Sequence, residues 1–98
     1  MNGQYILVDG EPVEEFDLIK WGRFMQSETR KVALDEVGGI KISTVFLGLD
    51  HSFGGWVPVL WGTMIFGGKH DQYQERYTTK QKALEGHAKA VALVKSGE

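Results

Sequence analysis

The residues best suited to chemistry in this sequence are an adjacent acid and histidine, Asp50 and His51. They follow a β-rich run and precede a glycine-containing loop, a position from which side chains can converge on a pocket. An imidazole there can act as a general base or as a metal ligand. The pair can equally form part of a binding surface, or Asp50 can simply bond the amides of its own loop. The sequence leaves these three interpretations open.

A metal centre would have few ligands to draw on. The sequence contains no cysteine, and its other histidines, His70 and His87, make no His-x-x-x-His pair. A metal would therefore need scattered carboxylates as ligands. His87 falls on the apolar stripe of a C-terminal helical pattern, where an imidazole usually completes a hydrogen bond in the core. We expect no metal and no cofactor, and we interpret His87 as structural.

Three aromatic residues accompany the Asp50-His51 pair. Phe53 and Trp56 lie in the glycine-containing loop, and Trp61 follows it. Such aromatics either anchor a partner protein or cap the open end of the core. Base stacking would lack its electrostatic partner, because no lysine or arginine occurs between Lys41 and Lys69. We assign no catalytic residue, and the candidate binding residues are Asp50, His51, Phe53, Trp56 and Trp61.

Other patterns associated with catalysis are incomplete. None of the three glycine pairs precedes a helix in a phosphate-binding pattern, so we interpret them as turns. Ser43, Thr44 and Thr63 lie inside β-rich runs and outside any nucleophile-elbow context. A Ser-His-Asp hydrolase is therefore not expected.

Acidic residues gather near the N-terminus, at Glu11, Glu14, Glu15 and Asp17. They could attract a basic partner. Compensation of a helix dipole at the start of a helix explains the same residues without any partner. The sequence favours this second explanation.

Composition bounds the class of protein. The 98 residues suffice for one domain and are too few for two, and 42% hydrophobic content is enough for a core. The net charge of −2, with both signs spread along the chain, offers no basic footprint for nucleic acid. We find no secretory signal and no apolar run near the about 18 residues of a membrane span. These features predict a single soluble domain in a reducing cytoplasm.

The first half of the chain predicts a strand at residues 5–8, a helix at 13–27 and then a β-hairpin. The hairpin joins residues 30–37 to 40–49 through Gly38-Gly39, a pair typical of two-residue turns. Its register would set Val37 against Ile40, Glu36 against Lys41, Leu34 against Ser43 and Val32 against Val45. Both faces of this hairpin are partly apolar.

The second half predicts strands at 57–66 and 73–77 and a final helix capped by Thr78. The fold class is therefore α+β, an antiparallel β-meander of about four strands with one N-terminal and one C-terminal amphipathic helix packed on the sheet. We expect both helices on the same face. The apolar residues of the opposite face would then need cover from a homodimer or a partner protein.

Residues 43–55, Ser-Thr-Val-Phe-Leu-Gly-Leu-Asp-His-Ser-Phe-Gly-Gly, with 58–68, Pro-Val-Leu-Trp-Gly-Thr-Met-Ile-Phe-Gly-Gly, resemble small uncharacterised proteins of tailed bacteriophages and prophages. The resemblance extends to residues 73–79 and to the helical tail with Gly86-His87. No catalytic residues are established for these proteins, so no residue role carries over. The resemblance implies a phage setting, in which small accessory proteins bind host enzymes or block defence systems such as CRISPR nucleases.

We therefore expect a non-enzymatic protein-binding module of the bacterial host cytoplasm, with a host or defence protein as partner and homodimerisation as a further option. Its surface would be the sheet face or the loop at residues 50–61. The alternatives are a small enzyme or ligand-binding protein with Asp50 and His51 at a pocket mouth, and a virion-associated structural protein. Membrane and nucleic-acid partners are not expected.

Overall fold

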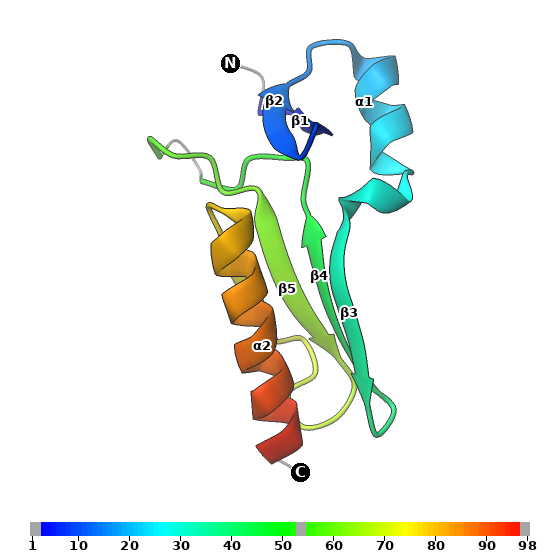
Figure 1. The fold of residues 1–98 in the computed structure, drawn as a ribbon, viewed down its shortest axis with the longest axis vertical. Coiled ribbons are helices and arrows are strands. Elements are labelled where there is room, and N and C mark those ends of the chain that lie inside the picture. Colours follow the sequence, from blue (N-terminus) through cyan, green and yellow to red (C-terminus); the bar gives the residue numbers. More distant parts are fainter. Residues whose placement is uncertain (1–2, 53–54, 97–98) are drawn as a thin grey trace.

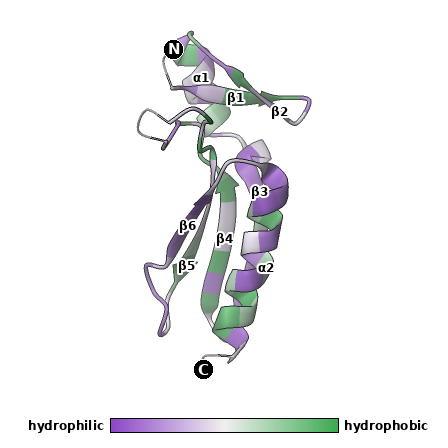
Figure 2. Cartoon of the chain, turned by 90° about the vertical axis from the view of Figure 1, so that its left-hand side faces the viewer, coloured by the Kyte–Doolittle hydropathy of each residue, from purple (hydrophilic) through white to green (hydrophobic). Residues whose placement is uncertain are grey.

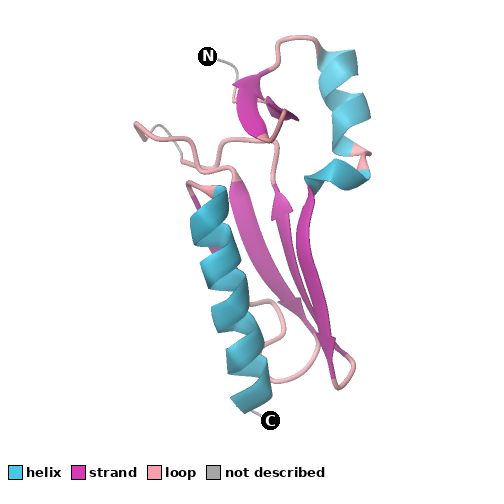
Figure 3. Cartoon of the chain, viewed as in Figure 1, coloured by secondary structure: helices cyan, strands magenta, loops and turns pink. Residues whose placement is uncertain are grey.

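The fold is α+β, with a four-stranded antiparallel sheet in the order β3-β4-β5-β6, a separate two-stranded sheet and two helices (Figures 1 and 3). The structure is a computed structural model, and it describes residues 3–52 and 55–96. The elements are β1 (Tyr5–Val8), β2 (Glu11–Glu14), α1 (Leu18–Met25), the 3-10 turn η1 (Glu28–Arg30), β3 (Lys31–Val37), β4 (Ile40–Phe46), β5 (Trp61–Phe66), β6 (Gln74–Tyr77) and α2 (Lys80–Ser96).

The β3–β4 hairpin confirms the predicted register beside its turn, where Val37 pairs with Ile40 and Leu34 with Ser43. Gly38 and Gly39 both have positive φ, as a two-residue turn of this twist requires. The predicted pairing of Val32 with Val45 is wrong. A bulge between residues 31 and 33 sets Lys31 opposite Val45 instead. The extra residue lets Val32 pack against the core, because a bulge re-aims the side chains beyond it.

The N-terminal helix is shorter than the sequence predicts, because residues 11–14 form a strand rather than a first helical turn. Asp9 and Gly10 both have positive φ and turn β1 back into β2, which pairs with it in antiparallel register. Helix α1 then begins at Leu18, capped by Asp17, whose side chain accepts from the amides of Ile19 and Lys20.

Only α2 covers the large sheet, which corrects the expectation that both helices pack on one face of it. Helix α1 and the β1–β2 hairpin lie at the end of the sheet (Figures 1 and 2). They are anchored to the segment after β4, where the carbonyl of Gly48 accepts from the Tyr5 amide at 2.9 Å and from Trp21 Nε1 at 3.0 Å. Phe24 of α1 packs edge-on against Phe46 at the end of β4.

The core has two apolar clusters, both between the sheet and the elements that cover it. One lies where β1 and α1 meet the sheet end and includes Tyr5, Phe46 and Trp61. The other lies under the C-terminal half of α2 and includes Ile42, Ile65 and Val94. Helix α2 buries residues 83, 87, 90 and 94, at the three- and four-residue spacing that the sequence predicts.

The start of α2 differs slightly from the sequence-based expectation. Thr79, rather than Thr78, caps it, because the Thr79 hydroxyl accepts from the Lys82 amide at 3.1 Å. The two strands before α2 are also shorter than predicted: β5 begins at Trp61 and β6 at Gln74. Within the described part of the chain, neither helix has the length and apolar content that crossing a membrane requires.

Candidate functional site

The side of the large sheet that faces away from α2 is here called the outer face, and none of the helices and strands among residues 3–52 and 55–96 covers it. Alternate residues of each strand point to it because successive side chains of a strand alternate between faces. The cross-strand register aligns Leu34, Ser43 and Met64 in one row and Val45 and Gly62 in another. The same face also carries Glu36, Lys41, Phe66, Gln74 and Arg76.

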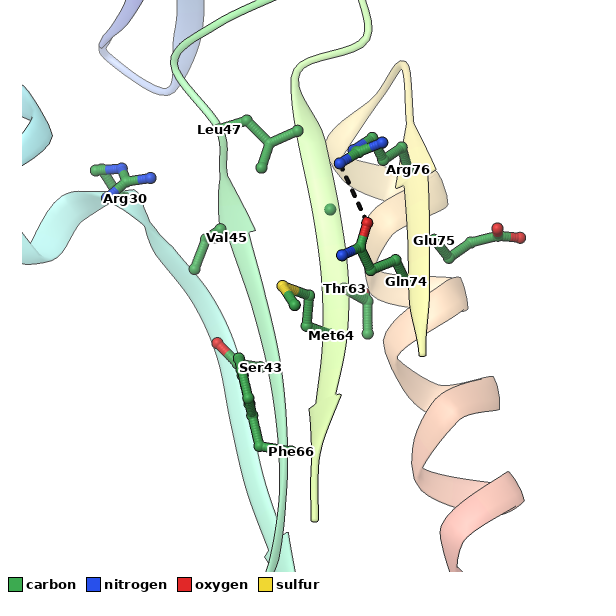
Figure 4. Close-up of a pocket in the computed structure, with 11 residues that line it drawn as sticks. Arg30, Ser43, Val45, Leu47, Thr63, Met64, Phe66, Gln74, Glu75 and Arg76 are labelled. Carbon is green, nitrogen blue, oxygen red and sulfur yellow. Dashed lines mark hydrogen bonds between the residues drawn. The ribbon is translucent and has the colours of Figure 1, made fainter. Parts of the chain in front are cut away.

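A shallow hollow of about 260 Å³ lies in this outer face. Its floor is apolar, formed by Val45, Leu47 and Met64, with Gly62 between them (Figure 4). Gly62 deepens the hollow because its missing side chain exposes the neighbouring strand surface; a Cβ there would touch Leu47. The outer face therefore has an apolar centre without any helix above it.

The apolar character continues beyond the hollow. Leu34, outside the hollow, is 59% exposed, and Phe66, which lines the hollow at its far end, is 48% exposed. Single exposed apolar residues are common on proteins, but a contiguous exposed group marks an interaction surface more often. Here the exposed residues join the half-buried floor across three neighbouring strands.

Two arginines flank the hollow at its end nearest α1. Arg30 is held by two main-chain carbonyls, with Nε donating to Phe46 at 3.1 Å and Nη1 to Met25 at 3.2 Å. Arg76 Nη2 donates to Gln74 Oε1 at 3.2 Å (Figure 4). These acceptors are all neutral, so the hydrogen bonds orient both guanidinium groups without compensating their charge. The hollow thus combines an apolar floor with two arginines and one acid, Glu75, among its lining residues.

Asp50 is placed by its own loop. Its Oδ1 accepts from the amides of Ser52 at 2.8 Å and Val59 at 2.9 Å, and its Oδ2 accepts from the Ser52 hydroxyl at 3.0 Å. Burial acts to raise the pKa of Asp50, but these hydrogen bonds, the Val59 amide first, outweigh it and leave the pKa below its ordinary value. This geometry matches the loop-organising role among the three interpretations.

His51 is half-buried beside Asp50, and its amide donates to the Val59 carbonyl at 3.0 Å. Burial lowers the pKa of His51, and the nearby positive charge of Arg76 lowers it further against the opposing effect of Asp50. A neutral imidazole is thereby favoured. Neither Asp50 nor His51 lines the hollow of the outer face.

The structure separates the three aromatic candidates. Trp56 is 100% exposed in the loop before β5. Trp61 is buried at the start of β5, where its ring meets Phe46 edge-on at 5.3 Å, so it belongs to the core rather than to an exposed surface. Phe53 lies outside the described residues.

A series of hydrogen-bonded polar side chains crosses the covered face between the two apolar clusters, and it is buried except at its Asp35 end. His87 Nε2 lies 2.7 Å from Asp35 Oδ2, and His87 Nδ1 lies 2.7 Å from Thr44 Oγ1. Thr44 meets Thr63, whose Oγ1 accepts from the Tyr77 hydroxyl at 3.1 Å. The Asp35 carboxylate can only accept, so His87 Nε2 donates to it, and in a neutral ring Nδ1 then accepts from Thr44. With this assignment, the hydroxyl of Tyr77 donates to Thr63, the hydroxyl of Thr63 to Thr44, and the hydroxyl of Thr44 to His87 Nδ1.

This Asp-His-Thr arrangement has the connectivity of a hydrolytic triad, but it is closed to substrates. Thr44 is 0% exposed, and its hydroxyl is engaged with both Thr63 and His87. A nucleophile needs access to the reacting carbonyl. The chain therefore satisfies buried polar groups, which agrees with the structural role expected for His87.

The sequence predicts that one sheet face needs cover, but the candidate residues named from it all lie at residues 50–61. The signal for the outer face was the alternation in β4 and the residue after it, where Ser43, Val45 and Leu47 interleave with the core positions. Among the described residues, no group of three histidine or acidic side chains is placed to hold a metal ion. Comparison of the chain with protein-family models, curated proteins and solved structures gives no match.

Proposed function

We propose that this chain is a non-enzymatic protein-binding module and that the outer face is its contact surface. The observation that carries the proposal is the apolar centre of that face, which no element of the described chain covers. Protein interfaces typically combine an apolar core with a polar rim, and arginine is enriched in them. The hollow, with Arg30 and Arg76 beside it, has this composition.

The class of partner follows from the resemblance to phage proteins. Small phage accessory proteins act on host enzymes or on anti-phage defence proteins, such as CRISPR nucleases, and occupation of such a protein requires a surface rather than a catalytic site. The proposed partner is therefore a bacterial host or defence protein, met in the host cytoplasm.

A catalytic role at Asp50 and His51 has less support. All the polar contacts of the Asp50 carboxylate serve the loop, and the pair does not line the hollow. The only hydroxyl-imidazole-carboxylate arrangement found among the described residues is the buried one at Thr44. A binding role accounts for the exposed apolar face, which a catalytic role at the loop leaves unexplained.

Affinity capture from lysate of the bacterial host tests the proposal. The bait proteins are the wild-type chain, a Leu34→Thr/Phe66→Ser variant of the outer face, and a Trp56→Ala variant of the loop. We expect the wild type and Trp56→Ala to recover the same stoichiometric partner and the outer-face variant to lose it. Interface apolar anchors commonly contribute 2 kcal/mol or more, roughly 30-fold in affinity.

Thermal unfolding of each bait provides the control, because Leu34 and Phe66 are exposed and their replacement should leave the fold intact. Retention of the partner by the folded outer-face variant, with loss in Trp56→Ala, would assign binding to the loop instead. Recovery of no partner by any bait would count against the binding role itself.

A further inference from the structure

The N-terminal part of the chain presents a second exposed apolar surface of opposite charge. Residues 9–19, here called the acidic segment, contain no lysine or arginine, and their acids are Asp9, Glu11, Glu14, Glu15 and Asp17. Two of these acids already have contacts within the chain: Glu15 pairs with Lys20 at 3.5 Å, and Asp17 caps α1. Phe16, Leu18 and Ile19 are 69%, 64% and 70% exposed at the start of α1. Three large apolar side chains left in solvent within four residues, around the N-cap Asp17, are unusual for a surface with no partner.

The outer face has the complementary charge. It carries Lys41 and Arg76, with Arg30 at the rim of the hollow and Glu36 as an acid on the same face. Lys31, also on this face, forms an ion pair with Glu28 at 2.9 Å. Glu75 also lines the hollow, so with Glu28 and Glu36 three acids stand against the four cations. The outer face therefore keeps a small positive excess, although the whole chain has a net charge of −2. One chain thus bears two uncovered apolar surfaces, one acidic and one basic.

We propose that these two surfaces bind each other between copies of the chain, with the acidic segment of one copy seated on the outer face of another. The exposed side chains of Phe16, Leu18 and Ile19 supply apolar groups for the hollow. The surrounding carboxylates face the guanidinium groups of Arg30 and Arg76. Burial of apolar surface drives the contact, and the opposite charges set its orientation.

Within one copy of the chain, the acidic segment cannot reach and cover the outer face of its own sheet. The acidic segment lies at one end of the 44 Å long axis, next to α1 and beyond the end of the sheet (Figure 1). Trp21 Nε1 fixes α1 there through the Gly48 carbonyl, and Arg30 holds the end of α1 through the Met25 carbonyl. The segment could reach the hollow of its own sheet only by breaking these contacts.

Charge also distinguishes this contact from a symmetric pairing of two outer faces. That pairing would bring Arg30, Lys41 and Arg76 of one copy toward the same residues of the other, and like charges across an interface are unfavourable. The acidic segment instead offers carboxylates to these cations. This inference goes beyond the proposed function, because self-association and a host partner would compete for one surface.

The test measures molar mass against protein concentration by sedimentation and by light scattering after size exclusion. We expect the wild type to self-associate reversibly at low salt. The dissociation constant should rise with salt, because the screening length falls from about 10 Å at 0.1 M to about 3 Å at 1 M. Arg76→Glu, on the outer face, and Phe16→Ser/Ile19→Ser, on the acidic segment, should each weaken association about tenfold or more.

Mixing the two variants gives the decisive result. Each retains the surface that the other lacks, so an equimolar mixture of Arg76→Glu with Phe16→Ser/Ile19→Ser should form a one-to-one complex at concentrations where each variant alone is monomeric. Lys89→Glu, on an exposed position of α2, makes the same charge change elsewhere and should behave as wild type. Circular dichroism checks that every variant is folded.

A wild type that stays monomeric at low salt up to millimolar concentration overturns the inference. Association that survives in both variants, or a mixture that forms no complex, also overturns it, because another surface or a symmetric contact would then be responsible. These results are separable from the proposed function. If the chain is monomeric but the outer-face variant still loses its host partner, self-association fails and the binding module stands.

Discussion

The two faces of the large sheet are built from the same strands, yet one is closed and the other is open. On the covered face, Ile42, Thr44, Thr63 and Ile65 have no solvent exposure, because α2 lies against them. On the outer face, the residues next to them in sequence, such as Ser43 and Met64, stay partly accessible. The comparison shows that the alternation of a strand supplies two surfaces, and that a single helix decides which one becomes the core.

Where α2 packs on β6, the covered face has no room for an added methyl group. A substitution at Gly86 tests this. A methyl group on Gly86 would overlap the ring of Tyr77, which is buried and held by its hydrogen bond to Thr63. We expect Gly86→Ala to lower the free energy of unfolding by about 3 kcal/mol, measured by urea denaturation. The loss would occur although alanine favours a helix by about 1 kcal/mol over glycine.

The same substitution, glycine to alanine, in the exposed helix α1 serves as the matched control. Gly22 lies inside α1 with no atom near the position of a Cβ and with no positive φ. Gly22→Ala should therefore raise the free energy of unfolding by up to about 1 kcal/mol. If both substitutions stabilise the protein, the close contact of α2 with Tyr77 is incorrect.

Two hydroxyl residues adjacent in β4 test the same contrast at the level of polar groups. Thr44→Val keeps the shape of the side chain but interrupts the buried chain, leaving His87 Nδ1 without its donor and Thr63 without its acceptor. We expect a loss of about 2 kcal/mol in denaturation. Ser43→Ala, one residue away on the outer face, should change stability by less than about 0.5 kcal/mol. Equal losses of stability in Thr44→Val and Ser43→Ala would mean that solvent reaches the covered face and the outer face equally.

A smaller loss than for Thr44→Val is expected in the loop between β4 and β5, which hydrogen bonds rather than burial hold in place. Asp50→Asn retains an acceptor for the loop amides but loses the charge, which should cost about 1 kcal/mol at pH 7. Because the folded-state pKa of Asp50 is lowered, its contribution is present above the ordinary carboxyl pKa of about 3.9 and is lost as the pH falls through the lowered value.

The difference in unfolding free energy between wild type and Asp50→Asn should therefore shrink as the pH is lowered below about 4. Denaturation curves at several pH values measure it. A difference that stays constant down to acid pH would mean that the carboxylate does not organise the loop.

Local patterns predicted the parts of the fold that local interactions stabilise. Gly38-Gly39 specified the hairpin turn, and the register beside it followed from turn geometry. The three- and four-residue spacing in the final helix predicted an apolar stripe at Ala83, Leu84, His87, Ala90, Val91 and Val94. All of these except Leu84 and Val91 are buried, and Leu84 is 46% exposed. The helix predicted from Val13 was wrong at its start, because the β1–β2 hairpin uses residues 11–14 and its turn signal, Asp9-Gly10, was interpreted only as the end of a strand.

The candidate site was predicted less well than the fold. The loop at residues 50–61 attracted attention because it combines Asp50 and His51 with aromatics, but the carboxylate of Asp50 serves the loop and Trp61 serves the core. The outer face has no motif, since its residues come from η1 and from separate strands, and nothing in their spacing indicates which face α2 will cover.

The sequence by itself determined the turns, the final helix and the two-sided apolar character of the strands, because these depend on neighbours within a few positions. Only the tertiary structure decided that α2 covers the face with Thr44, that α1 stays beyond the sheet end, and that the opposite face remains open. These outcomes depend on contacts between residues far apart in the chain, such as His87 with Asp35 and Trp21 with Gly48. Such contacts have no fixed spacing in sequence, so the partner of each residue emerges only when the chain packs.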